Sequence, residues 1–170
     1  MFGWNGAKSQ KTYKTAEPVA TYGDTGAGVM SGIASGTRVG TAIGWRDVAS
    51  LQVGDMVLTF DNGVQRLKGI TRSQLWSGDG PCPVRFWPLM VPAGVLDNSR
   101  PMVLLGRQGV MLESDIAEER YGDPFALIPA TALEGLLGIE RTYPTGPIEV
   151  ITLEFESEQI VFGDPGTLMF

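Results

Sequence analysis

The sequence predicts an all-β domain of short strands with one or two short helices. The chain has 170 residues, and its 23 glycines and 11 prolines indicate that it is interrupted by many turns. Apolar residues make up 43% of the chain, which is enough for a globular core. From Gly36 onward, short apolar segments are separated by turn residues at the spacing of an all-β domain. We therefore expect one β domain over residues 33–170, preceded by an extended N-terminal arm over residues 1–32.

The first predicted strands surround a tight turn. Residues 37–42 and 56–61 have the composition of strands, and Asp61-Asn62-Gly63 is a strong turn signal before a strand over residues 64–70. We expect a hairpin there. The apolar segment 84–95 contains too many prolines for a helix.

Further strands are predicted over residues 102–105 and 110–112. A short helix is expected over residues 114–121 with Ser114 as its N-cap, and a second over residues 130–137 that ends at Gly138. The C-terminal part alternates between apolar and polar residues, which predicts a last hairpin with strands over 148–155 and 158–162.

Charge and cysteine content exclude several functions. The net charge is −6, and residues 1–32 hold three lysines against Glu17 and Asp24, or +1, which leaves −7 for residues 33–170. Neither part has the basic surface that binds nucleic acid. Cys82 is the single cysteine and there is no histidine, so we predict no internal disulfide, no metal site and no cofactor.

The N-terminal sequence has no continuous apolar stretch after a basic start, so no secretory signal is predicted. The longest apolar run, residues 86–96, contains Pro88 and Pro92 and is shorter than the roughly 18 residues that span a bilayer. We expect a cytoplasmic or assembly-bound protein, without assigning a compartment.

The N-terminal arm has the composition of a segment that binds another protein or the domain itself. It is rich in small polar residues and shows no sustained periodicity. Its aromatic side chains would be poorly hydrated in isolation. The candidate partner-binding residues are Phe2, Trp4, Lys8, Lys11, Tyr13, Lys14 and Tyr22.

One stretch carries a family resemblance. It runs Gly36-Thr37-Arg38-Val39, then Gly44-Trp45-Arg46-Asp47-Val48, then Leu51-x-Val53-Gly54-Asp55-x-Val57-Leu58-Thr59. This pattern resembles the opening of bacterial Hint (hedgehog/intein) domains, and weaker similarity extends the resemblance over residues 33–163. The resemblance implies a pseudo-symmetric β fold that breaks the chain at its first residue by an acyl shift.

The positions that would carry this chemistry are altered. The acyl shift needs a thiol or hydroxyl nucleophile and a histidine that acts on the departing amide. The resemblance places the nucleophile at Gly32, and the two histidines of the family at Pro101 and Glu158. It therefore predicts an inactive Hint-like domain that serves as a structural or protein-binding accessory subunit of a larger assembly, docked through its arm.

Two alternatives remain open at the level of sequence. The domain could process itself through Ser31 or Ser35, with Thr37 or Arg100 polarising the amide. The resemblance could also be accidental, and the chain an unrelated β-rich virion or cell-surface structural protein.

Overall fold

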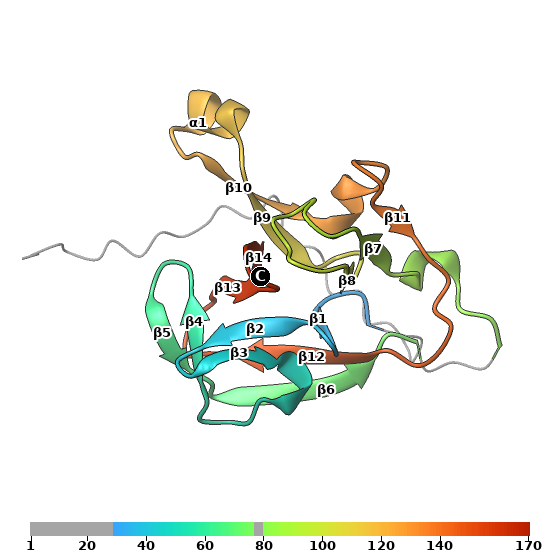
Figure 1. The fold of residues 1–170 in the computed structure, drawn as a ribbon, viewed down its shortest axis with the longest axis horizontal. Helices are drawn as coiled ribbons and strands as arrows, with labels where there is room; N and C mark the ends of the chain where they lie inside the picture. Colours follow the sequence, from blue (N-terminus) through green and yellow to red (C-terminus); the bar gives the residue numbers. More distant parts are fainter. Residues whose placement is uncertain (1–28, 77–79) are drawn as a thin grey trace, which may run out of the picture.

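The computed structural model describes residues 29–76 and 80–170, whose strands form two antiparallel sheets (Figure 1). The first sheet contains β1 (Ile33–Ala34), β6 (Gly69–Gln74), β7 (Leu89–Val91), β8 (Met102–Leu104), β11 (Glu140–Arg141) and β12 (Glu149–Glu154). Its order is β11-β7-β8-β1-β12-β6. The two-residue strand β1 therefore lies inside the sheet, with Ile33 opposite both Leu104 and Ile151.

The second sheet has eight strands in the described part of the chain. They are β2 (Arg38–Thr41), β3 (Gly44–Asp47), β4 (Met56–Thr59), β5 (Gly63–Arg66), β9 (Gly109–Glu113), β10 (Phe125–Pro129), β13 (Val161–Gly163) and β14 (Thr167–Met169). Seven follow the order β10-β9-β14-β13-β2-β4-β5, and β3 pairs with β2. The all-β fold class is confirmed.

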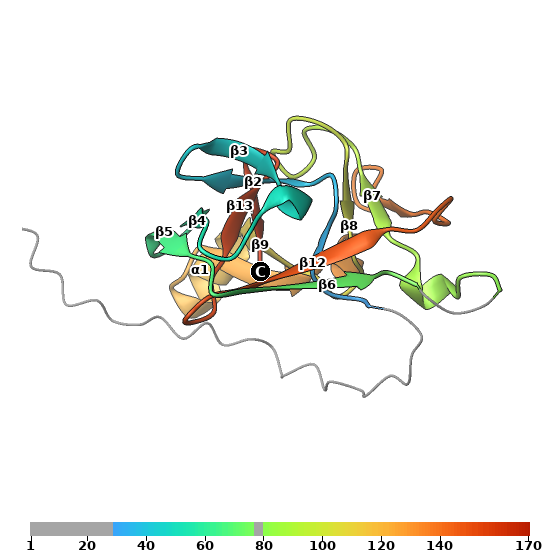
Figure 2. The same cartoon turned by 90° about the horizontal axis from the view of Figure 1, so that it is seen from below.

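The chain passes from the first sheet to the second after β1, β8 and β12. Figure 2 shows β6 and β12 running side by side along one side of the molecule, with β2 and β3 on the other. Because these connections are short, the ends of strands from both sheets meet close to β1.

The buried side chains form two clusters, and the two residues of β1 point to opposite faces of the sheet, one into each cluster. Ile33 and Ile151 belong to the main core, which also contains Val39 and Val57 of the second sheet. Ala34 packs instead in a second cluster on the other face, together with Val150. Adjacent residues of a strand point to opposite faces, so both faces of the first sheet are covered near β1.

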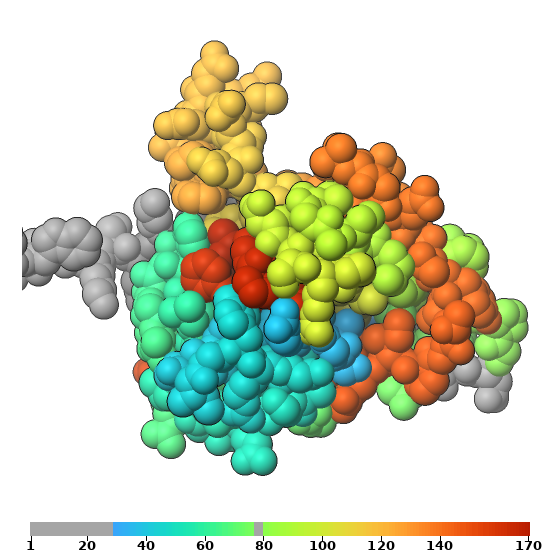
Figure 3. Space-filling view, viewed as in Figure 1, coloured from blue at the N-terminus to red at the C-terminus, as the bar shows by residue number. Residues whose placement is uncertain are grey.

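Helix α1 (Asp115–Tyr121) confirms the predicted helix over 114–121. The Ser114 side chain accepts a hydrogen bond from the backbone N–H of Ala117, and Gly122 ends the helix in the left-handed conformation. α1 projects from the body of the molecule at the ends of β9 and β10 that it connects (Figure 3).

The hairpin predicted around Asp61-Asn62-Gly63 is also confirmed, with β4 paired to β5. The Thr59 hydroxyl donates to the carbonyl of Gly63 at 2.7 Å across the turn. Gly63 has a φ of 61°, a conformation that glycine adopts without steric penalty.

Two predicted elements are wrong. Residues 148–155 and 158–162 do not form a hairpin, because β12 pairs with β1 and β6 while β13 pairs with β14, β2 and β4 in the other sheet. The predicted helix over 130–137 is a single 3₁₀ turn, η3 (Ala130–Leu133), which Glu134 ends in an extended conformation. The alternation of apolar and polar residues and the intrinsic propensities indicate whether a segment forms a strand or a helix. They do not determine which strand pairs with which.

The described residues contain no helix that is long and apolar enough to cross a membrane. The candidate partner-binding residues of the arm, from Phe2 to Tyr22, lie outside the described part of the chain. Two further short 3₁₀ turns are η1 (Val48–Ser50) and η2 (Val84–Phe86).

Candidate functional site

The segment that leads into β1 is held by backbone hydrogen bonds. The N–H of Val29 donates to the carbonyl of Leu75 at 3.1 Å, and the N–H of Arg107 donates to the carbonyl of Met30 at 2.8 Å. The chain then turns at Gly32, which has a φ of +116°. This is a conformation that residues with a side chain rarely adopt.

Gly32, the expected nucleophile position, has no room for a side chain. A Cβ atom on Gly32 would lie 2.7 Å from Cγ1 of Val150 and 3.2 Å from the carbonyl oxygen of Ile151. Val150 is fully buried and belongs to the second apolar cluster. A cysteine or serine at this position would require both a backbone change and a movement of the buried Val150 side chain.

We expect a side chain at Gly32 to destabilise the fold more than one at Gly36. Both glycines have positive φ, but a Cβ at Gly36 meets nothing within 4 Å. Gly36→Ala should therefore cost only conformational strain, about 1–2 kcal/mol of unfolding free energy. Gly32→Ala adds the overlap with Val150, typically about 1–3 kcal/mol more. Denaturant unfolding of both variants measures the difference, and equal losses would contradict the packing described here.

Pro101 does not lie at the level of Gly32. Extending the antiparallel pairing of Ile33 with Leu104 by three residues along each segment places Pro101, the residue before β8, at the level of Gly36. Pro101 is exposed to solvent. Its neighbour Arg100 donates through Nη2 to the carbonyl of Gly36 at 2.6 Å. The structure thus separates two of the positions that the resemblance implied would act together.

An ion-pair cluster occupies the region beside Gly36. Oδ1 of Asp164 accepts hydrogen bonds from Nε of Arg100 at 2.9 Å and from Nε of Arg38 at 3.3 Å. The Asp164 side chain is only 1% exposed. This cluster joins β2 to the segments just before β8 and just after β13, and sequence reasoning missed Asp164. An aspartate two residues after the apolar segment 160–162 was the available signal.

Glu158, the third altered position, lies with Gly32 at one groove. The groove has a volume of about 530 Å³, and Ser31, Gly32 and Ile33 are among the residues that line it. The other lining residues are 151–155, 157–159, Val161, Met169 and Phe170. Pro101 and Ser35 are not among the lining residues.

The two serines considered as nucleophiles are exposed, and neither hydroxyl has a hydrogen-bond partner among residues 29–76 and 80–170. An acyl shift at Ser35 would attack the carbonyl of Ala34, which accepts the N–H of Thr37 at 3.2 Å. A shift at Ser31 would attack the carbonyl of Met30. Arg100 donates to the carbonyl of Gly36 instead, so this hydrogen bond polarises neither the Ala34 nor the Met30 carbonyl.

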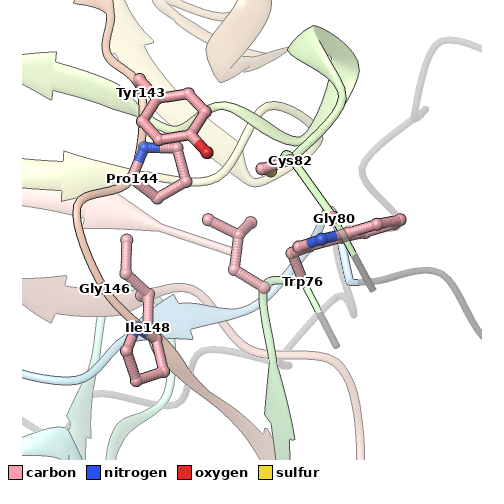
Figure 4. A pocket seen from close by; sticks show the side chains of 9 residues that line it. Trp76, Gly80, Cys82, Tyr143, Pro144, Gly146 and Ile148 are labelled. Atoms are coloured by element: carbon pink, nitrogen blue, oxygen red, sulfur yellow. The ribbon is translucent and has the colours of Figure 1, made fainter. Parts of the chain in front are cut away.

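Cys82 lies apart from these positions, in the second apolar cluster. Figure 4 shows it beside a small pocket of about 180 Å³ with Trp76 and Tyr143. Burial raises the pKa of the Cys82 thiol, which lowers its fraction of reactive thiolate. This agrees with a structural role.

The sequence profile of the Hint domain family matches residues 32–166. The chain belongs to the Hint domain family. The match begins at Gly32, the residue that the resemblance placed at the nucleophile position, and it overturns the alternative of an unrelated β-rich protein.

One solved structure shows the same fold. The solution structure of a bacterial intein-like domain from Clostridium thermocellum superimposes with a TM-score of 0.60 at 10% identity, over 83% of this chain and 98% of that one. The crystal structure of the MchDnaB-1 intein is similar with a TM-score of 0.49 at 14% identity, over 81% of this chain and 97% of that one. A comparison with curated proteins finds no match. The Hint family and the two-sheet architecture are thus established for this chain.

Proposed function

We propose that this Hint domain is catalytically inactive and serves as a structural, protein-binding accessory subunit of a larger assembly, which it contacts through its N-terminal arm. The observation that carries the proposal is the packing at Gly32, where Val150 fills the space that a nucleophilic side chain would need. The chain also has no histidine, so the general acid of the acyl shift is missing.

The residues around the altered positions support a structural role. Asp164 binds two arginines at the level of Pro101, and the carbonyl beside them, that of Gly36, is already hydrogen bonded. Glu158 is exposed at the groove and carries a carboxyl group in place of the imidazole that the resemblance implies for this position. The arm supplies aromatic and lysine side chains of the kind found at protein interfaces.

The intact mass of the purified chain tests inactivity. We expect a single mass near 18.3 kDa, unchanged after incubation with a strong thiol or with hydroxylamine, because either nucleophile would trap an acyl-shifted ester. The Ser31→Ala/Ser35→Ala double variant is the matched control and should behave identically.

Loss of about the first thirty residues, in the parent chain but not in the double variant, would restore self-processing through a serine and refute inactivity. Cleavage in both proteins would point to a contaminating protease.

A further inference from the structure

The groove beside Gly32 combines an apolar floor with an acidic rim. Its floor includes Leu153 and Phe155, which are partly exposed, and its rim carries the exposed Glu154 and Glu158 as the only charged residues among those that line it. Neither glutamate forms an ion pair within the described ranges. The hydroxyl of Thr71 donates to Glu154 at 2.9 Å, which orients the carboxylate without neutralising it.

The chain next to the groove leaves it open. The residues just before Ser31 do not follow the groove, because Val29 and Met30 pack in the second apolar cluster on the other face of the first sheet. Their hydrogen bonds to Leu75 and Arg107 fix this path. Among the residues that the structure describes, no segment therefore covers the floor of the groove. Phe170, which also lines the groove, is 39% exposed.

The first part of the chain has the complementary chemistry. Residues 1–16 contain three lysines and no acidic residue, whereas the whole chain is acidic. Large apolar side chains, Trp4 and Tyr13 among them, are interspersed with these lysines. Cationic side chains can pair with the rim while aromatic rings cover the floor, and the apolar contact supplies most of the stability because exposed ion pairs contribute little.

We propose that the groove beside Gly32 binds the chain's own N-terminal segment, residues 1–28, with its lysines on Glu154 and Glu158. The linker over residues 15–28 reaches about 45 Å when extended, more than the distance across a domain whose radius of gyration is on the order of 15 Å. This contact goes beyond the proposed function, since it concerns the isolated chain and holds whether or not a partner exists. A partner that binds the arm must then compete with the groove.

Zero-length carbodiimide cross-linking of the full chain tests the contact, because it joins a lysine to a carboxylate only when the two groups touch. We expect peptides that join Lys8, Lys11 or Lys14 to Glu154 or Glu158, recovered from the monomer band. Their yield should fall at high salt, because salt screens exposed charges.

The Glu154→Gln/Glu158→Gln variant should lose these cross-links, since an amide does not react. The control is Glu118→Gln/Glu119→Gln, which removes two exposed carboxylates from α1. This variant should give the same lysine cross-links to Glu154 and Glu158 as the parent chain. Cross-links to α1 in place of the groove, cross-links found only in a dimer band, or none from the three lysines would each overturn the proposal. Inactivity is measured independently by the intact mass, so one result can fail without the other.

Discussion

Asp164→Asn is expected to lower the free energy of unfolding by about 2–4 kcal/mol. Removing one partner of a buried ion pair typically costs about 3–5 kcal/mol, because the remaining charge loses its compensation. Here the two arginine side chains are 35% and 44% exposed, so water recovers part of the loss. Asparagine preserves the shape of the side chain and tolerates the φ of 23° at this position. Denaturant unfolding measures the change.

Glu149→Gln is the matched control for this prediction. Glu149 pairs with Arg72 at 3.2 Å, and their side chains are 42% and 43% exposed. Exposed pairs of this kind contribute roughly 0–1 kcal/mol. If Asp164→Asn costs no more than Glu149→Gln, the buried cluster does not hold β2, β8 and β13 together.

Gly166→Ala is expected to destabilise the protein by about 2–5 kcal/mol, the sum of left-handed strain and backbone overlap. Gly166 has a φ of +118°, and a Cβ there would lie 2.5 Å from the carbonyl oxygen of Asp97. Asp97 is itself in a left-handed conformation, with a φ of 59°, so its backbone has little freedom to retreat. The obstacle is main chain and cannot be relieved by a rotamer change.

Gly44→Ala separates the two contributions to this loss. Gly44 has a similar φ of +112°, but a Cβ there would meet nothing within 4 Å, so only strain of about 1–2 kcal/mol is expected. Thermal or denaturant unfolding of the two variants should differ by at least about 1 kcal/mol. A Gly166 variant as stable as the Gly44 variant would show that the Asp97 loop yields easily.

Local signals in the sequence predicted local structure well. The β4–β5 hairpin followed from a three-residue turn signal, and α1 followed from Ser114 at its start. The C-terminal hairpin failed because two alternating segments next to each other in sequence go to different sheets. Strand alternation reports which residues face a core, but the choice of neighbour depends on contacts from distant parts of the chain.

For the candidate site too, the sequence predicted some features, whereas others depend on contacts between distant segments. The resemblance named Gly32 and Glu158, which the structure brings to one groove, but Pro101 lies at the level of Gly36. The glycine could be identified as a missing nucleophile from sequence, whereas the packing of Val150 against it is a tertiary property. Asp164 was missed for the same reason, since its burial depends on three separate segments.

The interior position of β1 also determines when this protein can fold. β1 is completed only by β8 and β12, and Val39 of β2 lies opposite Gly163. β1 therefore lacks its neighbour β12 until residues more than a hundred positions later have been synthesised, although β2 can pair with β3 and β4 before then. Such distant pairings make folding slow, because the entropy of closing long loops is lost before the contacts form. On the ribosome, β7 and β8 can pair early, but the first sheet cannot be completed until β12, residues 149–154, has emerged.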